Sequence, residues 1–166
     1  TLFSRALAVD TAEASAEDLV RAALDYARAA ELGHPGAANN LGLLFHAGRG
    51  VAQDHEEARR WFDRAVAAGF AGAGVNLGVM AFYGQGGPRD LDRARDLLTT
   101  AAKVGDVRAV TLLGSWSYEG AGGSGIDRAT AARWYTVAAE RGVVVAQHRL
   151  GRMLLAGDGV EADPVE

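Results

Sequence analysis

Residues 37–69 read AANNLGLLFHAGRGVAQDHEEARRWFDRAVAAG, and the pattern in this segment returns along the chain. Its first marker is the dipeptide Leu-Gly, which begins at Leu41, Leu77, Leu113 and Leu150. These positions are separated by about 36 residues. Self-similarity at a fixed period of this size is the sequence signature of a repeat protein.

Other residue types recur in the same register. An alanine lies five residues before each Leu-Gly glycine, and an aspartate follows that glycine after about twelve residues. The aspartates are Asp54, Asp90, Asp127 and Asp163, and Asp18 matches them one interval earlier. Apolar residues at 37, 41, 44 and 45 fall on one face of a helix. The period therefore predicts two helices per unit, with a Gly-rich turn after the first and an aspartate at the start of the second.

The aspartates and glycines have expected roles at the helix ends. Each aspartate is predicted to be the N-cap of a second helix, a contribution of about 1 kcal/mol. Glycines in the turns are typical of left-handed residues that end helices. The glycine of each Leu-Gly pair lies inside a helix, where it costs about 1 kcal/mol relative to alanine. We expect close approach of a neighbouring helix there, at the pairs Leu41 and Gly42, Leu77 and Gly78, Leu113 and Gly114, and Leu150 and Gly151.

A unit of this length cannot bury its apolar face alone, so stacked neighbours must share a core. The sequence therefore predicts an all-α fold, an α/α superhelical solenoid that forms a single repeat domain over residues 1–166. We expect a degenerate first repeat at 1–33, full repeats at 34–69, 70–105 and 106–142, and a truncated last repeat at 143–166. The missing initiator methionine and the incomplete last unit suggest a piece of a longer protein.

Composition excludes several classes of protein. The 166 residues include no cysteine, which rules out a disulfide scaffold and thiolate chemistry. The net charge of −4 and the absence of a Lys/Arg block argue against binding to nucleic acid or to an anionic membrane. No apolar run approaches the roughly 20 residues that span a bilayer. The abundance of Ala, Arg, Gly, Asp and Val hints at a bacterial source, and the compartment stays open between cytoplasm and periplasm.

The repeating pattern resembles a known family. Ala-x-x-x-Leu-Gly, an aromatic residue, Gly-x-Gly-Val, Asp, Ala-x-x-Trp-Phe-x-x-Ala and a closing Gly are similar to the Sel-1-like repeat, a branch of the tetratricopeptide-like solenoids. The resemblance covers about residues 18–166. Residues 70–105 depart from it, because Ala81 replaces the aromatic residue and Leu97-Leu98 replaces Trp-Phe. Residues 106–142 carry one inserted residue in the turn. The resemblance implies an adaptor or scaffold of macromolecular complexes.

Similarity to tetratricopeptide repeats also suggests which first-helix positions line a concave groove. A protein or peptide partner is expected to contact Asn39, His46, Tyr83, Thr111, Tyr118, Glu119, His148 and Arg152. Alternatives remain for some of these positions. Phe82 and Tyr83 could instead fill the space left by Ala81, and Tyr118 could be exposed or packed. Trp116 and Met80 are expected in the core, and Asn40 and Asn76 are expected to make structural hydrogen bonds.

Catalytic patterns are weak. The four histidines lack the spacing of metal ligands, so they are expected to be solvated. The glycines of residues 120–125 lack the lysine and the preceding strand of a phosphate-binding loop, which favours an expanded turn. We therefore expect no catalytic residue, metal or cofactor, and a non-enzymatic adaptor that binds its partner in the groove. The alternative is a structural spacer in a larger bacterial protein whose activity lies elsewhere, and self-association of the repeats is also possible.

Overall fold

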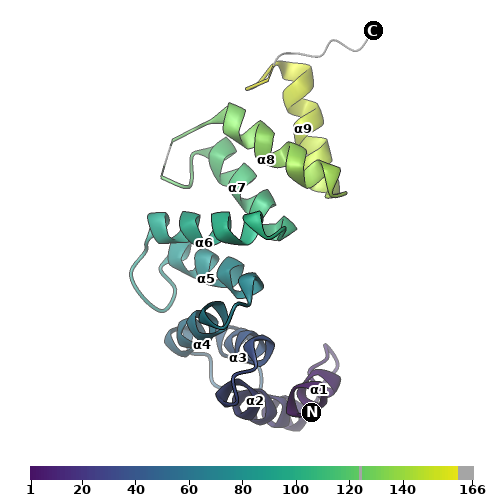
Figure 1. Cartoon of the computed structure of the whole chain (residues 1–166), viewed down its shortest axis with the longest axis vertical. Coiled ribbons are helices and arrows are strands. Elements are labelled where there is room, and N and C mark those ends of the chain that lie inside the picture. Colours follow the sequence, from purple (N-terminus) through teal and green to yellow (C-terminus); the bar gives the residue numbers. More distant parts are fainter. Residues whose placement is uncertain (124, 161–166) are drawn as a thin grey trace. The chain divides into compact units, whose positions relative to one another are not determined.

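The computed structural model describes residues 1–123 and 125–160, which form helices and turns with no strand among them. The chain separates into two compact units, Thr1–Arg89 and Asp90–Glu166. The first unit contains five helices (Figure 1): α1 (Leu2–Val9), α2 (Ala16–Glu31), α3 (Pro35–Ala47), α4 (His55–Ala67) and α5 (Ala71–Tyr83). In the second unit the described residues form α6 (Leu91–Lys103), α7 (Val107–Glu119), α8 (Arg128–Glu140) and α9 (Val144–Ala156). The all-α prediction is confirmed.

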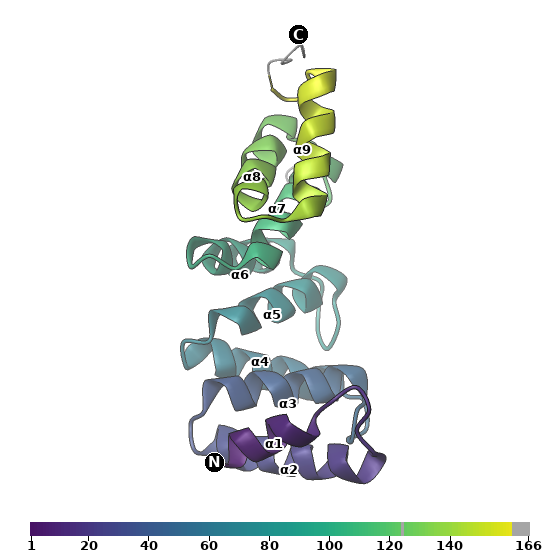
Figure 2. The same cartoon turned by 90° about the vertical axis from the view of Figure 1, so that its right-hand side faces the viewer.

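Consecutive helices pack against each other within each unit. In the first unit, α1 packs on α2, α2 on α3, α3 on α4 and α4 on α5 (Figure 2). In the second, α6 packs on α7, α7 on α8 and α8 on α9. The largest buried side chains of the second helices occupy one repeat position, eight residues after the aspartate: Tyr26, Phe62, Leu98 and Tyr135. The small alanines of the repeat are also buried, which lets the helices approach closely.

Three of the repeating aspartates cap their helices as predicted. The carboxylate of Asp54 accepts from the backbone N–H of Glu57, and Asp90 and Asp127 do the same at α6 and α8. The first helices of the repeats end at left-handed glycines, with φ between 64° and 72° at Gly48, Gly84, Gly120 and Gly157. The predicted helix ends are therefore confirmed at these positions.

Asp18 requires a correction, because it is not an N-cap. Helix α2 begins at Ala16, and Ser15 is its cap: the Ser15 hydroxyl accepts from the Asp18 N–H at 3.1 Å and donates to the Asp18 carboxylate at 2.7 Å. A hydroxyl placed three residues earlier offers the acceptor first, so the helix gains an extra turn. Asp163 lies outside the described residues.

The glycines of the Leu-Gly pairs differ in their surroundings. A Cβ built on Gly42 would lie 2.7 Å from the Phe62 ring, and one built on Gly114 would lie 2.9 Å from the Tyr135 ring. These two positions confirm the predicted close approach. A Cβ on Gly151 would meet no atom of residues 1–123 or 125–160 within 4 Å, so the predicted close approach is not found there. The rings that face Gly42 and Gly114 come eight residues after Asp54 and Asp127, respectively.

Candidate functional site

In the first unit, the expected groove residues have unequal exposure. Asn39 is buried at 7% exposure, and its carbonyl accepts from the Asn76 amide at 3.0 Å while its own amide donates to Asn40 at 3.1 Å. This chain of amides confirms the structural role expected for Asn40 and Asn76. His46 is half-buried, with Nε2 3.2 Å from the Gln85 side-chain oxygen. Tyr83 is 68% exposed at the end of α5, so it is the most available of the three.

In the second unit, the expected residues come from α7 and α9. Thr111 donates from its hydroxyl to the Val107 carbonyl at 2.7 Å, a bond within its own helix. Glu119, His148 and Arg152 are exposed. Within each unit, no hydrogen bond, ion pair or ring contact joins two of the eight expected residues in the part that the structure describes. Each therefore contributes to a surface rather than to a preformed cluster.

Tyr118 is less exposed than Glu119, His148 and Arg152, because an arginine side chain covers its ring. The Arg128 guanidinium lies 3.6 Å from the ring centroid and donates to the Tyr118 carbonyl at 2.7 Å. Arg128 also pairs with Asp158 at 3.5 Å. Tyr118 is consequently half-buried and held in place, whereas the 68% exposed Tyr83 lies nearly perpendicular to the Phe82 ring, with 4.9 Å between the ring centroids.

The histidines have more contacts than the sequence suggested. His34 is the N-cap of α3, and its Nδ1 accepts from the Ala37 N–H at 3.2 Å. The His46 and His55 rings are 5.1 Å apart. His55 Nδ1 is buried without a hydrogen-bond partner among the described residues. The expectation that all four are solvated is therefore wrong for His55, whereas His148 is exposed.

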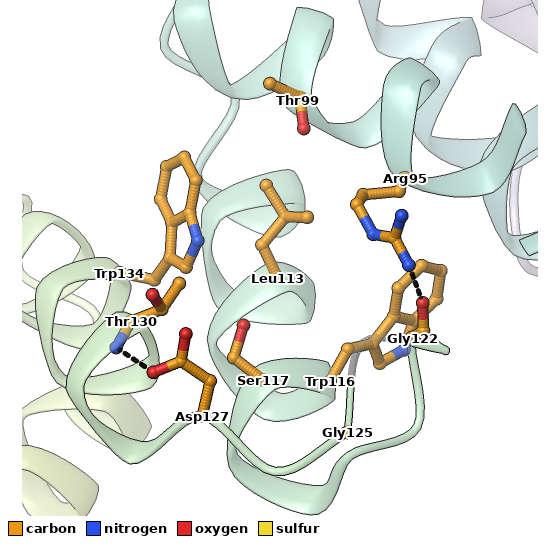
Figure 3. A pocket seen from close by; sticks show the side chains of 10 residues that line it. All are labelled: Arg95, Thr99, Leu113, Trp116, Ser117, Gly122, Gly125, Asp127, Thr130 and Trp134. Atoms are coloured by element: carbon orange, nitrogen blue, oxygen red, sulfur yellow. Dashed lines mark hydrogen bonds between the residues drawn. The ribbon is translucent and has the colours of Figure 1, made fainter. Parts of the chain in front are cut away.

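A concave site that the sequence reasoning missed lies among α6, α7 and α8. This α6–α8 pocket has a volume of about 160 Å³ (Figure 3). At about 100° per residue, helical spacing centres its α7 residues, at 113, 116 and 117, on the side of the helix opposite to the centre of the α7 residues expected to bind a partner, at 111, 118 and 119. The pocket is thus independent of the expected groove. It is lined by Arg95, Thr99, Leu113, Trp116, Ser117, Gly122, Gly125, Asp127, Thr130 and Trp134.

Two local departures from the repeat help to form this pocket. Ser117 occupies the position that Phe45 holds in the repeat 34–69, so a small side chain stands where a ring is expected. The turn of residues 120–125 is also longer by one residue. In other turns, a Cβ on the second glycine would lie 2.4 Å (Gly50) or 2.2 Å (Gly86) from the backbone of the preceding second helix. In the longer turn, a Cβ on Gly123 would lie 3.2 Å from the Leu91 side chain.

The charged groups at the rim of the α6–α8 pocket, Arg95 and Asp127, make hydrogen bonds within the protein. The Arg95 guanidinium donates to the Gly122 carbonyl and to the Asp92 carboxylate. The Asp127 carboxylate accepts from the Thr130 backbone N–H, which lowers the pKa of Asp127 below its usual value. Figure 3 shows the Arg95–Gly122 and Thr130–Asp127 bonds at opposite ends of the pocket. Both charged side chains at the rim therefore already make hydrogen bonds within the protein.

The described residues were also compared with the requirements of a metal site and of a membrane-spanning helix. No group of three or more His, Asp or Glu side chains among residues 1–123 and 125–160 is placed to hold a metal ion. No helix in the same ranges combines the length and the apolar character required to cross a bilayer.

Comparison with known proteins identifies the repeat. The Sel1 repeat model matches residues 35–70, 73–106, 107–143 and 144–166. No curated protein matches the chain significantly. Sel1 repeat proteins are generally non-enzymatic scaffolds for protein interaction.

Solved structures share the fold. The crystal structure of c5321, a protective antigen of uropathogenic Escherichia coli strains that displays an SLR fold, is 32% identical with a TM-score of 0.89, over 98% of this chain and 34% of that chain. A Sel1 repeat protein from Oxalobacter formigenes is 30% identical with a TM-score of 0.78, over 87% and 59% of the two chains. A Pseudomonas aeruginosa protein shares the fold at 24% identity and a TM-score of 0.63. This chain thus spans 34% and 59% of the first two proteins. By its repeats and its helix-pair solenoid fold, the chain belongs to the Sel1 repeat family.

Proposed function

We propose that this protein is a non-enzymatic adaptor that holds a protein or peptide partner against its first-helix surface. We define this surface by the eight residues Asn39, His46, Tyr83, Thr111, Tyr118, Glu119, His148 and Arg152. The single observation that carries the proposal is the exposure of Tyr83. Its side chain is 68% exposed and its hydroxyl has no hydrogen-bond partner among the described residues.

Tyrosine and arginine are the residue types that most often dominate binding energy at protein interfaces. Tyr83 presents a rigid ring that loses little conformational entropy on binding. Arg152 and His148 add exposed polar groups on α9, and Glu119 adds one on α7. Asn39 contributes less, because it is buried and its amide is already bonded to Asn40 and Asn76.

The test is affinity capture from a lysate of the source organism, followed by titration of the captured protein against purified variants. The surface variant carries Tyr83→Ala, Tyr118→Ala and Arg152→Ala. We expect it to lose binding by at least tenfold, since hot-spot truncations cost roughly 2 kcal/mol or more. Its melting temperature should change little, which shows that the loss is not caused by unfolding.

A matched control removes exposed side chains away from this surface. Leu32 is 80% exposed at the end of α2, Val104 is 67% exposed at the end of α6, and Arg133 is exposed on α8. The triple alanine variant at these positions should bind as the wild type does. Equal binding by the surface variant and the control variant would overturn the proposal.

A second candidate is a structural spacer within a longer protein. It is favoured by the comparison, because this chain matches only 34% and 59% of the length of two solved relatives. A spacer needs no partner on its first-helix surface. Absence of any captured protein that distinguishes wild type from the surface variant would therefore favour the spacer.

A further inference from the structure

We propose that the α6–α8 pocket binds a single phenol ring. The ring would come from a tyrosine side chain of a partner or from a free small phenol, which present the same chemistry. The site is separate from the first-helix surface, because the two use opposite faces of α7. The proposal rests on the size of the pocket, on its apolar walls and on the polar groups that face into it.

The size of the pocket matches one six-membered ring. Its volume is about 160 Å³. An engineered cavity of roughly 150 Å³ in another protein, lined by apolar side chains, is known to take up benzene. The position of Ser117 agrees with this size, because Phe45 supplies an aromatic ring at the same repeat position. The pocket therefore corresponds to a ring that this repeat does not provide.

The walls of the pocket are aromatic and aliphatic. Leu113 and Trp116 are 5% and 8% exposed, and Trp134 is half-buried. Indole rings pack favourably against another ring in edge-to-face or offset geometry. An aromatic ligand is therefore favoured over an anion, which would find Arg95 already bonded to Asp92 and Gly122 and would be repelled by the Asp127 carboxylate.

The polar groups favour a phenol over a plain benzene ring. In Figure 3 the hydroxyls of Thr99 and Ser117 and the indole nitrogen of Trp134 point toward the space between the lining residues. None of these three groups has a hydrogen-bond partner in the described part of the chain. A phenolic hydroxyl both donates and accepts, so it can pair with a hydroxyl and with an indole N–H together.

The experiment uses the chain's own tryptophans as reporters. Indole N–H signals of Trp61, Trp116 and Trp134 are followed in ¹⁵N–¹H spectra while p-cresol is added. Trp61 is an internal control, because it holds the same repeat position as Trp134 but lies in the first unit, beside Arg64. We expect the Trp134 and Trp116 signals to shift and saturate, with a dissociation constant on the order of 1 mM for so small a ligand. Trp61 should not move.

Toluene tests the role of the hydroxyl, since it has the ring and methyl group of p-cresol without the oxygen. We expect toluene to bind about two- to tenfold more weakly. Thr99→Val, which removes one hydroxyl at nearly constant shape, should reduce this preference. Thr100→Val is the matched control, because Thr100 is the exposed neighbour outside the pocket and its change should leave the preference intact.

Ser117→Phe tests the pocket itself, because it restores the aromatic residue found at Phe45. We expect it to abolish the p-cresol shift while the far-UV circular dichroism spectrum is retained. If that variant fails to fold, Ser117→Ala keeps the pocket open, and it should still bind toluene while losing part of the preference for p-cresol.

A blocked Gly-Gly-Tyr-Gly-Gly peptide distinguishes the two sources of the ring. Binding of p-cresol and of the peptide supports a partner's tyrosine, and binding of p-cresol alone supports a free phenol. The proposal is overturned if the Trp134 signal does not move at a p-cresol concentration ten times the expected dissociation constant. Equal affinity for toluene and p-cresol would also overturn it, as would undiminished p-cresol binding by a folded Ser117→Phe variant.

Discussion

Alanine substitution at Gly42, Gly114 and Gly151 compares one motif in three environments. All three glycines lie inside helices with ordinary negative φ, so alanine causes no backbone strain. In an open helix, alanine is favoured over glycine by about 1 kcal/mol. Gly151→Ala should show this gain, because its new Cβ meets no atom of the described residues within 4 Å. We expect it to raise the free energy of unfolding by about 0.5–1 kcal/mol.

At Gly42 the same gain is opposed by a collision. The new Cβ would lie 2.7 Å from the Phe62 ring, and Phe62 is 1% exposed, so the ring must shift within the core to make room. Overpacking of this kind costs about 1–3 kcal/mol. Subtracting the gain in helix propensity predicts a net loss between about 0 and 2 kcal/mol. Gly114→Ala should behave similarly, and movement of Tyr135 would also strain its 3.2 Å hydrogen bond to Ser115.

Urea unfolding followed by fluorescence separates these cases. Parts of a repeat protein can unfold separately, so the reporter must lie in the unit that carries the substitution. Trp61 reports on the first unit, and Trp116 and Trp134 report on the second. Equal stabilisation by Gly42→Ala and Gly151→Ala would refute the reasoning, because it would show that the Phe62 ring does not require a glycine opposite it.

Three other predictions concern stability. Leu77→Ala should lower the free energy of unfolding by about 2–5 kcal/mol in urea titrations, because Leu77 is fully buried; a loss below 1 kcal/mol would contradict its role in the core. Asp54→Ala should cost about 1 kcal/mol through loss of the bond to the Glu57 N–H, whereas Asp54→Ser should restore most of it in the same titration. The pKa of Asp127 is lowered by the Thr130 backbone N–H, and in Asp106 the bonds from Arg108 outweigh burial and also lower the pKa. Both folded pKa values lie below the unfolded value of about 3.9. Each carboxylate therefore stabilises the folded state above that pH, and this stabilisation is lost as the pH falls through the folded pKa. Urea titrations between pH 7 and pH 3 should therefore show a smaller loss in Asp127→Asn than in the wild type.

The repeat pattern predicted most of the helix ends because their causes are local. An aspartate N-cap and a left-handed glycine act within one helical turn of their own position. The roles of Asp54, Asp90 and Gly48 at helix ends could therefore be predicted from the sequence alone. Asp18 was misread because a competing hydroxyl, Ser15, stands only three residues away. A serine followed three residues later by an acidic residue is itself a recognised signal for a helix start, and it could have located this cap.

The candidate sites depended on contacts that the sequence does not contain. The first-helix positions followed from the similarity to tetratricopeptide repeats, but the burial of Asn39 and the cation over the Tyr118 ring depend on residues of other helices. The α6–α8 pocket was missed although its signals were present. Ser117 in place of an aromatic residue and one extra residue in a turn are small changes whose joint effect appears only when three helices pack together.

The sequence by itself determined the period, the helix pairs, most of the caps and the repeated apolar positions of the core, because each follows from helical geometry and from burial of a repeated apolar face. Tertiary structure alone decided which Leu-Gly glycine faces a ring and which side chains stay exposed. It also decided where two small local changes leave a cavity. These properties depend on distances between helices of a few ångströms, and such distances are set by the packing of many side chains together.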